Sequence, residues 1–546
     1  MAYNILVADK LADEGLNFLK QSGIAFDAKV GLKEDELAAE VGKYDALIVR
    51  SGAKVTARVL AEPGLLKAIA RAGVGVDNID LEAATAKGIL VLNTAEASTL
   101  STAEHALALM MSLARKIPAA SQSLRSGALD WKKRSAYQGT QLAGKTLGVV
   151  GMGRIGRTVA TRAIAMEMNV LGFDPYFSAQ TALDGKVRMV RDFDELLAQL
   201  DVITFHVPGG DQTRHLLNRD RLFGKCKPNL LVINDARGEV VDEFALAEAL
   251  KEKKIAGAAI DVFQTEPPAK DHPLFGIENA VLTPHLGAST DEAQTAVSVD
   301  AAKAIIAYLS SGEIRGAVNA GGIKLDLPPD EAPFLRLASR IGALLAGIHE
   351  GGYKTITLRA SGPRAQKHMA TLLRLATVEL LKPHLAAAAV NVINVEHIAR
   401  QRGIELVQIA EPQPPAGLVG DVVGVRVEGG NGGESHRILG TVYADGLPRV
   451  LRVDDFAMDM IPEGQMVTIL NKDQPGVIGT VGTSFGDANV NIADMVISRS
   501  FDKDGQAHAL MMIKTDSEPP EALANRLRAR PGIVRVKCLS LPSRAS

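Results

Sequence analysis

The sequence predicts an α/β protein with two doubly wound, Rossmann-like lobes, then an α+β region, then a small ferredoxin-like βαββαβ domain. Three observations lead to this prediction. Short apolar strands alternate with helical patterns over roughly the first half of the chain. A glycine-rich loop joins one of these strands to a helix. From about residue 462, the pattern reads strand, helix, two strands, helix and strand.

The composition is that of a globular protein with more than one core. A chain of 546 residues is expected to form about three or four domains, and 47% hydrophobic with 23% charged residues is ordinary for them. The net charge of −2 provides no general attraction for nucleic acid or for acidic membranes. In the apolar stretch "LLKPHLAAAAVNVINV", Lys382, Pro383 and His384 argue against a membrane span. Two cysteines, Cys226 and Cys538, are too few for a disulfide framework, so we expect a cytoplasmic location.

The elements of the first two lobes are predicted from their periodicity. "NILVAD", "DALIVRS" and "LKAIARAG" are short apolar runs typical of buried strands, and "ADEGLNFLKQ" has helical spacing. "AEHALALMMSLARKI" predicts a long apolar helix, with serine and threonine before it as candidate N-caps. The alternation continues through "DVITFHVP", "NLLVINDARG" and "IAGAAIDVF". Two parallel sheets with helices on their faces are therefore expected.

The loop "VVGMGRIG" predicts a dinucleotide site. Gly151, Gly153 and Gly156 have the G-x-G-x-x-G spacing between a strand and a helix, and the next strand, "VLGFD", ends at Asp174. Gly151 allows a tight turn, Gly153 lets backbone N–H groups approach a pyrophosphate, and Gly156 lets the helix pack on the sheet. The helix N-terminus favours the phosphate charge. Asp174 is expected to bind the adenosine ribose and to repel a 2′-phosphate, so the predicted cofactor is NAD.

Three chemically active side chains each follow an apolar strand of the second lobe. Arg237 follows "NLLVIND", Glu266 follows "AGAAIDVF" and His285 follows "NAVLTP". Loops after the strands of an open parallel sheet line the ligand crevice, so these side chains are expected to meet there. A single histidine beside an apolar run is more often structural, and it is the combination of the three that favours catalysis.

The three side chains suit the oxidation of an alcohol. The imidazole of His285 is suited to take the hydroxyl proton, and the Glu266 carboxylate to orient the ring and stabilise the imidazolium. The planar guanidinium of Arg237 is suited to bind a carboxylate and to polarise a carbonyl. The set predicts a dehydrogenase that transfers a hydride between a hydroxy acid and NAD.

These motifs resemble those of the D-isomer-specific 2-hydroxyacid dehydrogenases. "GMGRIG", "FDP", "INDARGEVVDEFAL", "DVFQTEPP" and "LTPHLGAST" carry the resemblance, and "VRSGAKVT" and "RAGVGVDNIDLEAATAKGILVLNT" extend it toward the N-terminus. The resemblance implies the same roles for His285, Glu266 and Arg237. Where Asp235 stands, members of the family often have a small residue or cysteine.

The resemblance also implies the division of the chain. Residues 1–98 and 287–318 are expected to form a substrate-binding lobe, 99–286 an NAD-binding lobe, 319–455 an intervening domain, and 462–546 an ACT-like regulatory domain. The substrate is expected in the crevice between the first two lobes. The implied cofactor contacts are Gly151, Gly153, Arg154, Ile155, Gly156, Asp174, Val207, Asp235, Ala236, Arg237, Asp261, His285, Gly287 and Ala288.

Basic residues near the crevice indicate a phosphorylated substrate. A phosphate carries nearly two negative charges at neutral pH and requires basic partners. Within the family, this favours the branch that oxidises 3-phosphoglycerate to 3-phosphohydroxypyruvate, the first step toward L-serine. The candidate substrate contacts are Arg50, Ser51, Lys54, Arg71, Gly73 and Arg134. Arg134 lies in "DWKKRSAYQG", which resembles a stretch that crosses a dimer interface, and a homodimer or homotetramer is expected.

Two other functions are compatible with the same motifs. One is an NADH-dependent reductase of glyoxylate, hydroxypyruvate or 2-oxoglutarate, which would not need the basic residues. The other is a dinucleotide-sensing regulatory protein, which would not need a proton acceptor such as His285.

The C-terminal region resembles an ACT domain, a module that binds amino acids, often between two copies. "NKDQPGVIGTVGTSFGDANVNIADM" contains the turn with Asp473, Pro475 and Gly476, and then Asn491. The resemblance implies L-serine as an effector, with its ammonium group at Asp473 and its polar groups at Asn491. Where relatives carry an aromatic residue or histidine, this chain has Asn471 and Lys472. A purely structural dimerisation module is the alternative.

Overall fold

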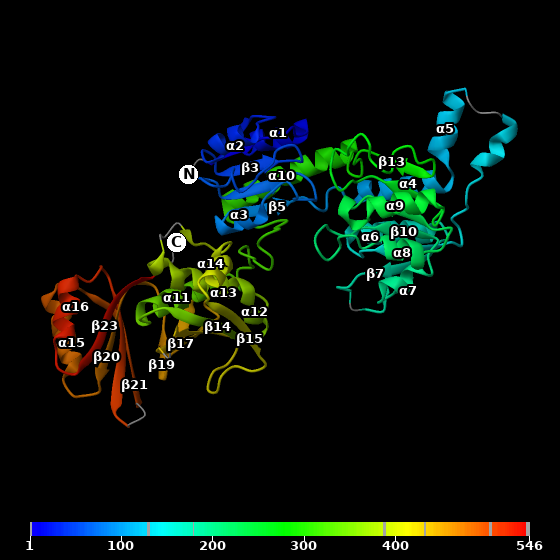
Figure 1. Ribbon diagram of the computed structural model, residues 1–546. Coiled ribbons are helices and arrows are strands. Elements are labelled where there is room, and N and C mark those ends of the chain that lie inside the picture. The colour runs from blue at the N-terminus through cyan, green and yellow to red at the C-terminus, as the bar shows by residue number, and fades with distance from the viewer. Residues whose placement is uncertain are drawn as a thin grey trace.

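The computed structural model describes residues 3–127, 131–177, 179–385, 389–430, 433–501 and 505–541. These residues form four sheets with helices packed on them (Figure 1). The predicted α/β class and the ferredoxin-like C-terminal domain are confirmed, and the region predicted as α+β contains a six-stranded sheet with helices packed on it. None of the helices in this part of the chain is long and apolar enough to cross a membrane. Cys226 and Cys538 are both free thiols.

The first lobe contains a parallel sheet in the order β2-β1-β3-β4-β5. Two buried clusters lie on its opposite faces, which explains why its central strands are apolar without alternation. Helix α10 packs on α1 and β4, so the chain returns to this lobe after leaving the second. The elements are β1 (Asn4–Val7), α1 (Asp13–Gln21), β2 (Ala25–Ala28), α2 (Glu34–Val41), β3 (Ala46–Val49), β4 (Ala68–Arg71), α3 (Leu81–Ala86), β5 (Leu90–Asn93) and α10 (Asp291–Ser311).

The second lobe contains an eight-stranded sheet in the order β13-β12-β11-β10-β6-β7-β9-β8. The order reverses direction at β6, so the loops after β6 and β10 border the crevice where a doubly wound fold binds its ligand. Asp192, Asn218 and Asp242 cap α7, α8 and α9 by accepting from backbone N–H groups. The elements are α4 (Thr99–Ala114), β6 (Thr146–Val150), α6 (Arg154–Ala165), β7 (Asn169–Phe173), β8 (Thr181–Ala182), β9 (Val187–Met189), α7 (Phe193–Leu197), β10 (Val202–Phe205), α8 (Arg219–Gly224), β11 (Leu231–Asn234), η2 (Gly238–Val240), α9 (Glu243–Lys251), β12 (Gly257–Ile260) and β13 (Ala280–Leu282).

An arm projects from the second lobe between α4 and β6. It contains α5 (Ile117–Arg125) and the 3₁₀ helix η1 (Trp131–Tyr137), and it stands away from the sheet at the upper right of Figure 1. No residue of α5 is buried, and Ile117, Leu124 and Trp131 expose more than half of their surface. The described part of the arm therefore has apolar side chains that the rest of its own chain does not cover.

The third and fourth sheets share a hydrophobic core. Met466 and Met512 of the last domain belong to the same buried cluster as Leu337 and Ile341 of α11. The third sheet has the order β15-β14-β16-β17-β18-β19, with α11 (Pro333–Ile348), β14 (Tyr353–Ser361), α12 (Pro363–Gln366), α13 (Met369–Leu381), η3 (Lys382–His384), α14 (Val395–Gln401), β15 (Glu405–Glu411), β16 (Val422–Gly429), β17 (Ser435–Val442), β18 (Pro448–Val453) and β19 (Phe456–Met460). The fourth has the order β21-β22-β20-β23, with β20 (Gly464–Lys472), α15 (Val477–Asp487), β21 (Ile492–Phe501), β22 (Ala507–Thr515), α16 (Glu521–Arg528) and β23 (Ile533–Leu541).

Candidate active site

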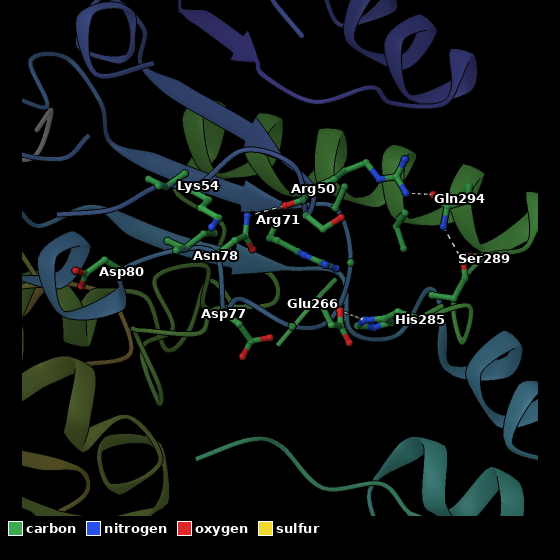
Figure 2. A pocket seen from close by; sticks show the side chains of 18 of the residues that line it. Arg50, Lys54, Arg71, Asp77, Asn78, Asp80, Glu266, His285, Ser289 and Gln294 are labelled. Atoms are coloured by element: carbon green, nitrogen blue, oxygen red, sulfur yellow. Dashed lines mark hydrogen bonds and ion pairs between the residues drawn. The ribbon is translucent and has the colours of Figure 1, made fainter. Parts of the chain in front are cut away.

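A cavity of about 840 Å³ lies between the first two lobes. Loops after β3 and β4 form one wall, and the loops after β12 and β13 contribute Glu266 and His285 (Figure 2). The predicted residues that line this cavity are Arg50, Ser51, Lys54, Arg71, Gly73, Glu266, His285 and Ala288. The first lobe thus brings its basic residues to the same space as the predicted proton acceptor.

His285 and Glu266 form a hydrogen-bonded pair at the edge of this cavity. The distance between His285 Nδ1 and Glu266 Oε2 is 2.7 Å, and Glu266 Oε1 accepts from the backbone N–H of Phe263 at 3.0 Å. Burial alone would raise the pKa of Glu266, but the hydrogen bonds from His285 and Phe263 outweigh it and lower the pKa. The carboxylate is therefore ionised, which stabilises positive charge on the imidazole ring.

The turn that carries His285 is held by Asp261, which directly follows β12. His285 has a positive φ of 55°, and its N–H donates to the Asp261 carbonyl at 2.8 Å. The Asp261 carboxylate accepts from the N–H groups of Leu286 at 2.8 Å and Gly287 at 2.9 Å, and His105 Nε2 lies 3.1 Å from it. Burial opposes ionisation of Asp261, but these hydrogen bonds lower its pKa. Asp261 thus fixes the conformation of the turn that carries His285.

Arg237 reaches from the second lobe to the first. Its Nε lies 3.1 Å from Oδ2 of Asp77, and its Nη1 donates to the carbonyl of Ala236 at 2.7 Å. A Cβ atom at Gly75 would collide with Nη2 of Arg237, so a glycine is required there for the guanidinium to approach. Arg237 consequently lies across the crevice, between the lobe that carries His285 and Glu266 and the lobe with the basic residues.

The opposite part of the cavity is strongly basic. Arg71 is the last residue of β4, and its Nε is buried without a hydrogen-bond partner among the described residues. Burial, followed by repulsion from Arg237, lowers the pKa of Arg71 to about 10, which still leaves the guanidinium charged at neutral pH. Arg50 is held by a hydrogen bond from its Nη2 to Gln294 of α10. The cavity thus presents cationic groups with unused hydrogen-bonding capacity to a bound anion.

The glycine loop has the space that a dinucleotide needs. A Cβ atom at Gly151 would meet the His206 carbonyl, and one at Gly156 would meet the Gly151 carbonyl, so both positions need glycine for close packing. At Gly153 nothing lies within 4 Å of the Cβ position, so the N-terminus of α6 is open to a pyrophosphate. These observations fit an NAD-binding loop.

Asp174 lies at the end of β7, beside this loop. Its carboxylate accepts from the N–H groups of Met152 at 3.0 Å and Tyr176 at 2.9 Å, so it already orders the glycine turn. Among the other predicted cofactor contacts, Val207 packs against Gly151, and Arg154 pairs with Glu96 at 2.6 Å. Ile155 of α6 is partly buried against the core, Asp235 and Ala236 are buried directly after β11, and Gly287 is buried in the turn after His285.

Some predicted site residues lie elsewhere. Arg134 is exposed on η1 in the projecting arm and does not line the cavity of its own chain. In the C-terminal domain, Asp473 Oδ2 lies 3.1 Å from Nε of Arg499, and Asn491 Nδ2 donates to Asp516 at 2.6 Å. The side chains predicted to hold an effector are therefore each engaged with a neighbour of their own domain.

The structure also reveals residues that were not singled out in the sequence. Asp77 orients Arg237, and Gln294 joins Arg50 to the loop after His285 by donating to the carbonyl of Ala288 at 2.8 Å. Asn78 donates to two backbone carbonyls of the loop after β3. Gln294 lies nine residues after His285 in "TPHLGASTDEAQ", and a helical reading of "DEAQTAVSVDAAKA" beginning at its Thr290 cap is the signal that places it near the crevice.

Comparison with known sequences and structures identifies relatives over the whole chain. Residues 107–287 match the NAD-binding domain of D-isomer specific 2-hydroxyacid dehydrogenases, 331–454 match the D-3-phosphoglycerate dehydrogenase intervening domain, and 465–532 match the ACT domain. D-3-phosphoglycerate dehydrogenase of Archaeoglobus fulgidus is 40% identical over 95% of this chain and 96% of its own. The enzyme of the same name from Methanocaldococcus jannaschii is 38% identical over 98% of this chain and 99% of its own.

Solved structures resemble the first two lobes. A glyoxylate reductase from Paecilomyes thermophila is 29% identical with a TM-score of 0.53, and covers 58% of this chain and 98% of its own. D-2-Hydroxyisocaproate dehydrogenase is 26% identical with a TM-score of 0.51, and covers 58% of this chain and 99% of its own. The two-lobed fold is thus shared with dehydrogenases of several 2-hydroxy acids. The side chains of the cavity, and not the fold, therefore determine which substrate binds.

Proposed function

The chain belongs to the D-3-phosphoglycerate dehydrogenases of the D-isomer-specific 2-hydroxyacid dehydrogenase family, and we propose that its interlobe cavity carries out their reaction. The reaction converts 3-phosphoglycerate and NAD to 3-phosphohydroxypyruvate and NADH, the first step of L-serine biosynthesis. One observation carries this assignment to the cavity. The His285–Glu266 pair and the cationic side chains of Arg50, Lys54 and Arg71 line one and the same space.

The two ends of the substrate require different parts of the cavity. The phosphate binds at Arg50, Ser51, Lys54 and Arg71, where two guanidinium groups and an ammonium group offset its two negative charges. Arg237 lies across the crevice and binds the carboxylate and the oxygen at the reacting carbon with the guanidinium donors that Asp77 and Ala236 leave available. The backbone N–H of Gly73, which donates to Thr94, fixes the loop that carries Arg71. The hydroxyl group is thereby directed to His285.

His285 removes the hydroxyl proton during oxidation. Its Nε2 faces the substrate when Nδ1 is bonded to Glu266, and the ionised Glu266 stabilises the imidazolium that forms. NAD bound at the glycine loop supplies the hydride acceptor. In the reverse direction, the imidazolium returns the proton to the carbonyl oxygen. General acid–base catalysis of this kind contributes a rate factor of roughly 10² to 10⁴.

Bound NAD is held by the second lobe. Gly153, Arg154 and Ile155 would hold the pyrophosphate, because the first turn of α6 offers N–H groups there. Asp174 would bind the adenosine ribose, and its charge would disfavour the additional phosphate of NADP. Asp261, Gly287 and Ala288 border the nicotinamide end, beside His285.

We infer that the site is completed by a second copy of the chain. Arg134 lies on the arm that exposes Ile117, Leu124 and Trp131, and these apolar side chains require a covering surface. An arm that packs on a partner places Arg134 of the partner subunit near the phosphate end of the cavity. A homodimer is the smallest assembly that both covers the apolar side chains of the arm and brings an Arg134 to each cavity.

The C-terminal ACT domain suits a small-molecule effector, and we infer that the effector is L-serine. Gly476 has a φ of 90° at the N-terminus of α15, and no side chain among the described residues caps the start of this helix, so the N–H groups of its first turn can bind a carboxylate. Asp473 and Asn491 supply an acceptor for the ammonium group and polar partners for the hydroxyl. A site shared between paired domains links effector binding to the relative orientation of the chains.

The direct test is the formation of NADH from 3-phosphoglycerate. Wild-type protein and His285→Ala are incubated with NAD and, in separate reactions, with 3-phosphoglycerate, D-glycerate and D-2-hydroxyglutarate. We expect the highest kcat/KM for 3-phosphoglycerate, and a large loss of that activity in His285→Ala. Activity with the unphosphorylated acids alone would assign the cavity to another 2-hydroxy acid, and NAD binding without turnover of any of them would favour a sensory role.

A further inference from the structure

A row of buried ionisable side chains crosses the second lobe at the carboxyl ends of its strands. His206, Asp235 and Asp261 each directly follow one of the neighbouring strands β10, β11 and β12. Phe205, Asn234 and Ile260 are in register, so the residues after them lie side by side. The side chain of His206 is 1% exposed, and those of Asp235 and Asp261 are fully buried.

Asp235 differs from its neighbour Asp261 in its hydrogen bonding. The Asp261 carboxylate has donors from Thr283, Leu286 and Gly287. Both oxygens of the Asp235 carboxylate are buried and have no hydrogen-bond partner among the residues that the structure describes. Nδ1 of His206 lies 3.6 Å from Oδ1 of Asp235, which is too far for a hydrogen bond. Asp235 is therefore a buried acid whose carboxylate receives no hydrogen bond from the side chains that the structure describes.

The groups around Asp235 favour its protonated form. Burial and, second, the nearby charge of Asp261 raise the pKa of Asp235 to about 7. His206 provides no compensating charge, because burial lowers its pKa to about 3 and keeps the ring neutral. When His105 and His285 are charged, they lower the pKa of Asp235. Of the other charged groups at this end, Glu266 is paired with His285, and the guanidinium of Arg237 lies at Asp77.

The reacting part of the cofactor must lie close to this acid. His285 has to reach the oxygen on the carbon that exchanges its hydride, so the nicotinamide ring lies on the same side of the crevice as His285. Asp235 lies within electrostatic range of His285, at the end of the strand next to β12. The ring carries a positive charge in NAD and none in NADH. A buried group near it experiences that difference without the screening of bulk water.

We propose that Asp235 discriminates between the two redox forms of the cofactor, losing its proton when NAD binds and keeping it when NADH binds. The inference rests on the proposed function, because it takes NAD as the cofactor of this crevice. A cationic ring stabilises the carboxylate, so NAD binding releases a proton at a pH where free Asp235 is protonated. The reduced ring has no such effect, and NADH binding leaves the proton in place. Asp235 thus favours the retention of NAD over NADH, and more so as the pH rises.

The size and sign of the effect follow from linkage. If the cationic ring lowers the pKa of Asp235 by one unit, the Kd of NAD falls roughly tenfold as the pH rises through the pKa values of the complex and the free protein. The Kd of NADH stays constant over the same range. Asp235→Asn is nearly isosteric and cannot ionise, so it removes the Asp235 contribution to the pH dependence of NAD binding. His285 contributes separately, and comparison of Asp235→Asn with His285→Ala distinguishes the two residues.

Titration calorimetry with the full-length protein tests the inference. Kd values for NAD and NADH are measured from pH 5.5 to 8.5, and the protons released near pH 7 are obtained from buffers of different ionisation enthalpy. The variants are Asp235→Asn, Asp235→Ser in case the first does not fold, His285→Ala, and Asp220→Asn as a control that removes a charge from the exposed surface of the same lobe. We expect proton release on NAD binding in the wild type, Asp220→Asn and His285→Ala, with a clear reduction in both Asp235 variants.

Two results would overturn the inference. One is equal proton release on NAD and NADH binding, and the other is an unchanged pH dependence of the NAD affinity in Asp235→Asn. Either leaves the proposed function intact, because the wild type still binds both forms. Failure of the wild type to bind NAD or NADH would instead remove the proposed function.

Discussion

Nδ1 of His285 lies 2.7 Å from Oε2 of Glu266, and the two residues come from loops after adjacent strands, β13 and β12. The backbone of His285 is fixed independently by Asp261, so the pair does not depend on a bound substrate for its geometry. This arrangement orients Nε2 of the ring and leaves half of the His285 side chain accessible from the cavity. The imidazole that we propose as the proton acceptor is thus oriented without a bound substrate.

Loss of this pair is expected to affect the chemistry more than the binding of the cofactor. His285→Ala should lower kcat by about 100-fold or more. The Kd of NADH, measured by fluorescence titration, should stay similar to that of the wild type. Glu266→Gln should lower kcat less and move the activity profile to lower pH for oxidation, because the imidazolium loses its anionic partner. Near-normal turnover of His285→Ala would remove His285 from the mechanism.

Asp174 is expected to set the preference between NAD and NADP. Its carboxylate lies at the end of β7 and holds the glycine turn through Met152. Asp174→Ala should weaken the binding of NAD and remove the charge that repels the 2′-phosphate of NADP. The ratio of kcat/KM for NAD to that for NADP should therefore fall by about tenfold or more. Measurement of both cofactors in the wild type is the essential comparison, and a wild-type preference for NADP would contradict the role of Asp174.

Asp261 is expected to stabilise the second lobe in a pH-dependent manner. Its pKa is lowered from the ordinary value of 3.8 when the protein is folded, mainly by its hydrogen bonds with His105 and Leu286 against the effect of burial. A lowered pKa gives stability that is complete above 3.8 and is lost as the pH falls through the folded value. Asp261→Asn should therefore lower the free energy of unfolding by about 2 kcal/mol at pH 7. In urea titrations, the difference from the wild type should stay constant down to about pH 4 and shrink below it, and a difference that grows on acidification would refute this account.

Serine binding is expected to compete with an ion pair in the ACT domain. Arg499 lies 3.1 Å from Asp473, so an ammonium group at Asp473 must replace this contact. In calorimetry with the full-length protein, Asp473→Ala and Asn491→Ala should abolish the heat of serine binding, and Arg499→Gln should lower the Kd. Asp494→Ala, on the exposed part of β21, is the matched control and should bind serine as the wild type does. If millimolar serine gives neither heat nor inhibition of the wild type, the ACT domain is better interpreted as an assembly module.

Much of the second lobe could be predicted because its signals are local. The glycine spacing, the apolar strands and the residues that follow them lie within short stretches, and parallel strands bring their carboxyl ends to one edge. For this reason, Glu266 and His285 could be placed in one site from the sequence. The roles of the individual residues remain predictions that the variants above would test.

Contacts between distant parts of the chain could not be predicted in this way. Asp77 and Arg237 are 160 positions apart, and Arg50 and Gln294 are 244 positions apart, so each pair depends on how the two lobes pack. Asp235 was noticed in the sequence for its charge, but its position between neighbouring strands depends on their register. Composition does not show that, among the described residues, its carboxylate is buried without a hydrogen-bond partner. The same limit applies to Asp473, whose pairing with Arg499 depends on the strand that follows α15.

The most direct test of the central claim is the selectivity of the cavity for a phosphate. The measurement is the ratio of kcat/KM for 3-phosphohydroxypyruvate to that for hydroxypyruvate, with NADH, in the wild type and in Arg71→Gln. We predict a wild-type ratio of at least about 100, and a decrease of about 30-fold in Arg71→Gln, since a charge-assisted hydrogen bond to the phosphate is lost. A wild-type ratio near one, or a ratio that Arg71→Gln leaves unchanged, would contradict the assignment of this basic cavity to 3-phosphoglycerate.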